Sequence, residues 1–264
     1  PPFGPGLAPG ATAWRPRDAV VGARCDHVYN RVLGTVNELR ARLGLEPVRH
    51  VHAQQYLLAD RTILFTAEPF EYPRERWPGG FRLVGPALWE PASAGSFDPP
   101  DGAPVVLVTA STAYQADERL ISTALAALAG EPVRVVVTTG AHDPAGFRPP
   151  ANAVVQRFVP HSAVLPHAAC VVSHGGMGIT QKALARGVPV CVVPFARDQF
   201  EVARRVEVCG AGARLPARRL SARRLRRAVR AASGRRAGAE RVAEAFARAG
   251  GARAAADAVE DLVR

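Results

Sequence analysis

The chain has 264 residues, of which 48% are hydrophobic and 22% are charged. This length allows one or two globular domains with a sizeable core, and no apolar run approaches the roughly twenty residues of a membrane span. The formal net charge of +11 is typical of nucleic-acid-binding proteins. However, Lys182 is the single lysine among 34 cationic residues, and no aromatic residues alternate with the basic runs. We therefore expect no nucleic-acid partner, and we interpret the arginine-rich segment 218–230 as a solvated helix.

The cysteines indicate the redox state of the compartment in which the protein is expected. Cys25, Cys170, Cys191 and Cys209 show neither the spacing of a metal site nor a Cys-x-x-Cys motif. Cys170 and Cys191 lie within apolar runs, where cysteine behaves as a small buried hydrophobic residue. Free buried thiols are typical of a reducing compartment, so we expect a cytoplasmic protein without a metal site.

The first 104 residues contain few strong secondary-structure signals. Residues 1–18 are rich in proline and glycine and predict an irregular loop. The patterns that follow predict a helix over 20–43, a short helix over 54–60, strands over 62–66 and 82–86, and a linker over 87–104. The linker assignment rests on its four prolines together with glycine and serine.

From Val105 onward, strand and helix patterns alternate. The predicted strands are Val105–Thr109, Val133–Thr138, Val154–Phe158, Cys170–Ser173, Val190–Val193 and Ala213–Leu215. Helices are predicted over 118–129, 162–167, the stretch ending at Gly187, 202–209, 221–232, 238–249 and 252–263. This alternation predicts an α/β fold with a doubly wound parallel sheet.

Polar residues follow several of the predicted strands. Ser111, Thr139, His161 and His174 each come shortly after a strand end. Ligands of doubly wound sheets bind outside the carboxyl ends of the strands. We therefore expect these four positions to share one cleft.

One stretch, Cys170–Pro194, has the pattern of a strand, a glycine loop, a helix and a second strand. The loop His174-Gly175-Gly176-Met177-Gly178 stands where the first strand passes into the helix. A helix N-terminus carries about half a positive charge and free amides, which together favour a phosphate. Such a loop also occurs where it only helps a helix to pack, so the loop alone does not decide between the two interpretations.

The longer run SHGGMGITQKALARGVPVCVVPFARDQFEVARRVEVCGAGARL, residues 173–215, resembles the donor site of nucleotide-sugar-dependent glycosyltransferases with the GT-B fold. The branch that it resembles comprises the bacterial natural-product enzymes that glycosylate macrolides, enediynes and similar aglycones. The resemblance implies a complete Rossmann-like donor-binding domain over 105–250, a C-terminal helix over 251–264 and a linker over 87–104. It also implies that residues 1–86 are the last portion of an acceptor domain whose front part is absent.

The resemblance implies a role for each donor-site position. Phe158 would stack on the base and His161 would hydrogen-bond its edge, although Phe158 could instead be core packing. The diphosphate would be bound by amides and side chains from Ser111, His174, Gly175, Gly176, Gly178 and Thr180, of which Thr180 could instead be a helix cap. Thr139 would belong to the same donor site. Asp198 and Gln199 would hydrogen-bond the sugar hydroxyls, although Asp198 could also act as an N-cap.

Two residues depart from the family pattern. Ile179 stands where a small hydroxyl residue is expected, and Lys182 stands where an acidic residue would hold the ribose diol. Lysine has no acceptor for ribose hydroxyls, so it would meet a phosphate instead, or donor binding would be rearranged or weakened.

By resemblance, the protein is an inverting glycosyltransferase that moves a sugar from a UDP- or dTDP-sugar to a hydroxyl of a hydrophobic natural-product acceptor. It would use no cofactor besides the nucleotide sugar. The catalytic base is expected in the absent part of the acceptor domain, so we expect the chain as given to transfer no sugar. Two alternatives stay open: a non-catalytic relative that activates a partner, which Ile179 and Lys182 favour, and a nucleotide-sugar epimerase on the same fold.

Overall fold

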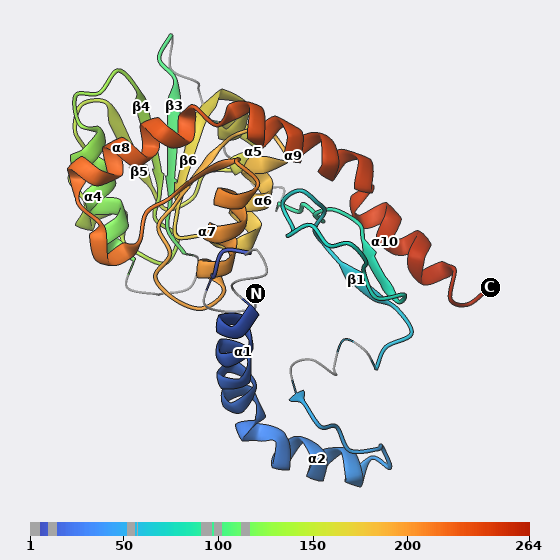
Figure 1. Cartoon of the computed structure of the whole chain (residues 1–264). Helices are drawn as coiled ribbons and strands as arrows, with labels where there is room; N and C mark the ends of the chain where they lie inside the picture. The colour runs from blue at the N-terminus through green and yellow to red at the C-terminus, as the bar shows by residue number, and fades with distance from the viewer. Residues whose placement is uncertain are drawn as a thin grey trace.

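A computed structural model describes residues 6–9, 15–51, 56, 58–90, 97, 102–111 and 117–264 of the chain. Its centre is a six-stranded sheet in which every pair of neighbours is parallel (Figure 1). The strands are β3 (Val105–Thr109), β4 (Arg134–Thr138), β5 (Ala153–Gln156), β6 (Ala168–Ser173), β7 (Val190–Val192) and β8 (Gly212–Arg214). The predicted α/β fold with a parallel sheet is confirmed.

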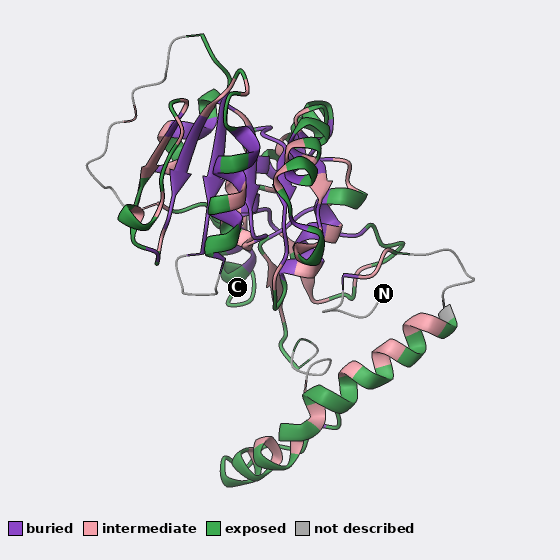
Figure 2. Cartoon of the chain, turned by 90° about the vertical axis from the view of Figure 1, so that its left-hand side faces the viewer, coloured by how far each residue is buried: buried purple, intermediate pink, exposed green. Residues whose placement is uncertain are grey.

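The sheet is buried on both faces because its strands are continuous apolar runs, as expected for parallel sheets. Successive residues of β3 point to opposite faces of the sheet: Leu107 belongs to one hydrophobic cluster and Val106 to the other. Helices α4 (Glu118–Leu128) and α8 (Ala222–Ser233) cover one face, and α5 (His161–Val164), α6 (Met177–Leu184), α7 (Gln199–Val208) and α9 (Arg236–Ala249) cover the other. Figure 2 shows the strands buried between these helices.

The strand order β5-β4-β3-β6-β7-β8 reverses direction between β3 and β6. The chain proceeds outward from β3 through β4 to β5, returns to β6 and then proceeds the other way through β7 to β8. Open α/β sheets bind ligands at such a switch point, beyond the carboxyl ends of the strands. The fold therefore predicts a ligand site at the loops after β3 and β6.

Two parallel strands, β1 (Thr62–Leu64) and β2 (Phe81–Leu83), form a small separate sheet. Both are shorter than predicted, because the chain bends at Phe65 and the second strand ends before Gly85-Pro86. Helix α10 (Gly251–Glu260) lies beside this pair (Figure 1), where the Gly251 amide donates to the Val84 carbonyl (2.5 Å). The last helix is thus held by an element far from it in the sequence.

The N-terminal helical region differs from its prediction. Helix α1 (Arg15–Tyr29) begins within the expected loop, and a 3-10 turn at Asn30–Val32 separates it from α2 (Leu33–Arg42). At this turn the Asn30 side chain accepts a hydrogen bond from the Val51 amide (3.0 Å), so it joins the helix to the segment that follows. The helix predicted over 54–60 is wrong at residues 58–60, which form a bend, and 54, 55 and 57 lie outside the described residues.

Helix α8 presents its arginines outward, as predicted, while Leu225, Val229 and Ala232 are buried. Arg226 and Arg230 both contact Glu131. A surface cavity of about 660 Å³ is lined by Ser221 and five arginines, Arg223, Arg224, Arg226, Arg227 and Arg230. This arginine face lies on a helix that covers the sheet rather than on the loops at the strand ends.

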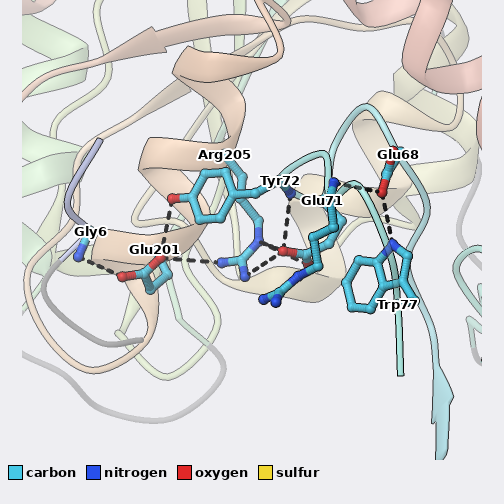
Figure 3. Close-up of polar contacts among 8 residues, drawn as sticks. Gly6, Glu68, Glu71, Tyr72, Trp77, Glu201 and Arg205 are labelled. Carbon is cyan, nitrogen blue, oxygen red and sulfur yellow. Dashed lines mark hydrogen bonds and ion pairs between the residues drawn. The ribbon is translucent and has the colours of Figure 1, made fainter. Parts of the chain in front are cut away.

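A buried ionic network joins the segment after β1 to α7 (Figure 3). The Arg205 guanidinium donates to both oxygens of Glu71 at 2.8–3.0 Å and lies 3.5 Å from Glu201. Glu201 also accepts from the Tyr72 hydroxyl (3.2 Å) and the Gly6 amide (2.7 Å). Burial and the Glu201 carboxylate raise the pKa of Tyr72. The network thus anchors the region before the linker to the large sheet.

We predict that Arg205→Ala lowers the free energy of unfolding by about 3–5 kcal/mol, because it leaves two buried carboxylates without their cation. Both Arg205 and Glu71 side chains are about nine-tenths buried. Arg236→Ala is the matched control, since its Glu240 pair is more than half exposed and should contribute about 1 kcal/mol or less. Urea unfolding measures the free energy of unfolding of both variants. An equal decrease in the two variants would contradict the structural role of the network.

Candidate functional site

The loops after β3, β4 and β6 meet at the switch point because these neighbouring strands are parallel. Ser111 follows β3, Thr139 follows β4 directly, and His174 follows β6 directly. All three side chains are at least nine-tenths buried. The structure therefore brings these predicted residues to one edge of the sheet.

The glycine loop needs glycine at two positions. Gly175 has a φ of +97°, in the left-handed region that favours glycine, and a Cβ there would lie 2.8 Å from Val192 Cγ1. A Cβ on Gly176 would lie 2.8 Å from His174 Nε2, because the imidazole lies against that residue. Gly176 is the N-cap of α6. His174 Nε2 is thereby placed at the positive end of the helix.

Two further loop residues differ in their surroundings. A Cβ on Gly178 would meet nothing within 4 Å, so packing does not require glycine there. Thr180 is not the helix cap, since Gly176 holds that position. The Thr180 hydroxyl is completely buried and has no hydrogen-bond partner among the described residues, so it reaches no ligand in this conformation. Ile179 packs against the core cluster under α6.

A buried carboxylate, Asp117, lies beneath the switch point and was not predicted. Its Oδ2 accepts from the Ser111 amide (2.8 Å), and its Oδ1 lies 2.7 Å from His142 Nε2. Thr139 donates its hydroxyl to the His142 carbonyl (2.8 Å), so its hydroxyl supports the loop instead of facing the cleft. The position of Asp117 directly before the helix at Glu118 was the available signal, but it indicates only a helix cap.

His174 is placed beside this carboxylate. Its Nδ1 lies 3.9 Å from Asp117 Oδ2. Burial lowers the pKa of His174, and the charges of Asp117 and Asp198 and the Thr109 carbonyl oppose that shift only in part. The imidazole is therefore mainly neutral at neutral pH in the unliganded chain.

The other end of the edge carries Phe158 and His161. Phe158 is 50% exposed, so the core-packing interpretation is wrong, and its ring is free to stack on a planar ligand. The His161 Nε2 lies 3.3 Å from the Thr138 hydroxyl, and burial lowers the pKa of His161 to about 4. A neutral His161 can both donate and accept a hydrogen bond.

Lys182 contacts a carboxylate and not an expected phosphate position. Its amine lies 3.1 Å from Glu90 Oε1, and Glu90 also accepts from the amides of His161 and Ser162 (2.9 Å each). Burial opposes the ionisation of Glu90, but these hydrogen bonds outweigh it and lower its pKa to about 2. A carboxylate from the segment after β2 thus holds the start of α5, and no local sequence signal marks it.

The loop between β7 and α7 carries the predicted sugar contacts. Asp198 is exposed and holds the N-cap position of α7 without a side-chain cap bond. Gln199 is buried, and its Oε1 accepts from the amides of Phe195 (2.8 Å) and Ala196 (3.0 Å). Gln199 therefore shapes the loop, while the Asp198 carboxylate is presented to solvent.

Among the residues that the structure describes, no group of three or more His, Cys, Asp or Glu side chains is arranged to hold a metal ion. Among the same residues, no helix is both long and apolar enough to cross a membrane.

Comparisons with known proteins agree with this fold. Residues 121–262 match the family described as the erythromycin biosynthesis protein CIII-like, C-terminal domain. The chain is 42% identical over 241 residues to 4'-demethylrebeccamycin synthase of Lentzea aerocolonigenes, covering 87% of this chain and 56% of the relative. It is 32% identical over 206 residues to the O-mycaminosyltylonolide 6-deoxyallosyltransferase of Streptomyces fradiae, covering 75% of this chain and 48% of the relative.

Solved structures show the same similarity. The calicheamicin glycosyltransferase CalG4 superimposes with a TM-score of 0.74 at 26% identity, covering 97% of this chain and 66% of that structure. The glycosyltransferase of kitacinnamycin gives a TM-score of 0.74 at 27% identity, covering 95% and 67%. The chain spans about half the length of the curated relatives that it matches. It belongs to the EryCIII-like family of GT-B glycosyltransferases, of which it contains the C-terminal domain.

Proposed function

We propose that residues 105–250 bind the donor of a natural-product glycosyltransferase, which transfers a sugar from a UDP- or dTDP-sugar to an acceptor hydroxyl. The observation that carries this proposal is the head of α6 at the switch point, where Gly175 packs closely on Val192 and Gly176 leaves room for the His174 imidazole. Free amides and the helix dipole favour a diphosphate there.

The remaining residues assign the other parts of the donor. The exposed ring of Phe158 would stack on the base, and His161 would hydrogen-bond its edge. Asp198, exposed after β7, would accept hydrogen bonds from sugar hydroxyls. Acceptors of the relatives include O-mycaminosyltylonolide, which supports a hydroxylated natural product as the acceptor here.

Catalysis by this domain would act on the leaving group. The acceptor oxygen attacks the anomeric carbon from the side opposite the diphosphate, which inverts the configuration, and the electron pair of the breaking bond stays on the diphosphate. The α6 amides and His174 would stabilise that developing charge, as preorganised donors do in other group-transfer reactions. A general base takes the acceptor proton; we place it outside the donor-binding domain.

A non-catalytic activator of a partner enzyme is the second candidate. The ion pair of Lys182 with Glu90 favours it, because the position expected to hold ribose is engaged within the protein. An epimerase would need acidic groups in the cleft, and Asp198 is the exposed carboxylate that we can assign to it. A measurement of nucleotide binding distinguishes a glycosyltransferase or an epimerase from a non-catalytic protein that has lost its donor site.

We expect UDP and dTDP to bind the chain in the absence of an acceptor. His174→Ala should weaken binding by about 1–3 kcal/mol, the range for a hydrogen bond to a charged group. His27→Ala is the matched control because His27 lies on the exposed helix α1. Isothermal titration calorimetry measures all three chains, and no heat with either nucleotide would refute the donor-site proposal.

Lys182→Glu tests the pairing at the nucleoside end. We predict that this change destabilises the chain, because it places a second carboxylate beside Glu90, and that Glu90→Gln removes most of the penalty. Coupling between contacting residues is typically about 0.5–3 kcal/mol. A double-mutant cycle by urea unfolding measures it. Equal effects of Lys182→Glu in both backgrounds would mean that the two side chains do not interact in solution.

A further inference from the structure

The carboxylate of Asp117 is completely buried directly behind the expected diphosphate position. One negative charge behind another is unfavourable in a site that must accept an anion, because Coulomb repulsion is strong where water is excluded. The neighbourhood of Asp117 therefore has to supply positive charge. Two histidines, His142 and His174, lie within 4 Å of the Asp117 carboxylate.

His142 already contacts two carboxylates. Its Nε2 lies 2.7 Å from Asp117 Oδ1, and its Nδ1 lies 3.1 Å from Glu118 Oε1. His142 thus lies between the two carboxylates, and its contact with Oδ1 holds the Asp117 side chain in place.

His174 lies between that group and the head of α6. Its Nε2 lies against Gly176, and its Nδ1 is buried without a hydrogen-bond partner among the described residues, 3.9 Å from Asp117 Oδ2. A buried nitrogen left unpaired is costly. As an imidazolium, His174 would donate from Nε2 to a phosphate oxygen and, after a small approach, from Nδ1 to Asp117.

We propose that the donor's diphosphate binds together with one proton, which His174 takes from solvent, and that Asp117, held by His142, is the positioning residue that stabilises this imidazolium. The inference rests on the proposed function, because it concerns the diphosphate of the same donor. The proton then faces the leaving diphosphate during bond breaking and returns to solvent when the nucleotide leaves.

The pH dependence follows from the groups that face His174. In the free chain, burial lowers its pKa below 6.5, against the opposing effects of Asp117 before α4, Asp198 before α7 and the Thr109 carbonyl on β3. A bound diphosphate adds negative charge and raises the pKa. Between the free and bound pKa values, binding takes up a proton, so affinity falls by up to about tenfold for each unit by which the pH rises.

Calorimetry with UDP-glucose and dTDP-glucose tests the proposal. A sugar diphosphate lacks the terminal phosphate monoester that titrates near pH 6, so a proton taken up near pH 7 is bound by the protein. We expect the observed heat to differ between two buffers of unequal ionisation enthalpy, and affinity to decline from about pH 6.5 to 8. His174→Gln should abolish the buffer dependence.

Asp117→Asn should flatten the pH profile, since an asparagine oxygen can still accept from the Ser111 amide but carries no charge. The matched control is Asp143→Asn, at a carboxylate that is 74% exposed after β4. Binding with equal heats in both buffers would overturn the inference and leave the proposed function standing, whereas no binding would refute the proposed function. If Asp117→Asn fails to fold, buffer dependence that persists in His174→Gln overturns the inference by itself.

Discussion

The parallel arrangement of β3 to β8 is the constraint on which the site depends. Because every strand of this sheet runs in the same direction, its carboxyl ends and the loops that follow them lie along one edge. The reversal of strand order between β3 and β6 opens that edge where Ser111 and His174 follow their strands. The proposed anion site is thus a consequence of topology, and the local sequence supplies only the glycines and the imidazole.

Helix α7 connects this edge to the rest of the chain. It begins at Gln199, whose amide oxygen fixes the loop that carries Asp198, and continues through Glu201 and Arg205, which hold Glu71 and Tyr72. A movement of the segment around Glu71 relative to the large sheet would therefore act on the helix that begins at the expected sugar contact. Charged groups buried in this network are fully paired, which avoids the large penalty of an isolated buried charge.

Local patterns were sufficient for the strands of the large sheet, because burial on both faces leaves continuous apolar runs such as those of β3 and β6. They were also sufficient for the glycine loop, where backbone geometry and the neighbouring imidazole restrict residues 175 and 176 to glycine. They failed where polar partners are distant in sequence: Glu90 reaches Lys182, and Asp117 reaches His142 and His174. They failed also for Thr180, whose place at the helix start suggested a cap or a ligand, although Gly176 is the N-cap and the Thr180 hydroxyl is buried.

Mapping of backbone amide shifts in NMR spectra during titration with a nucleotide sugar locates the bound diphosphate directly. The chain has a net charge of +11, and the arginine face of α8 could attract any anion without specificity. We predict that the largest shifts occur at Gly175, Gly176 and Ser111, at the head of α6 and the end of β3. Shifts confined to the arginines of α8, with an unchanged glycine loop, would contradict a donor site at the switch point.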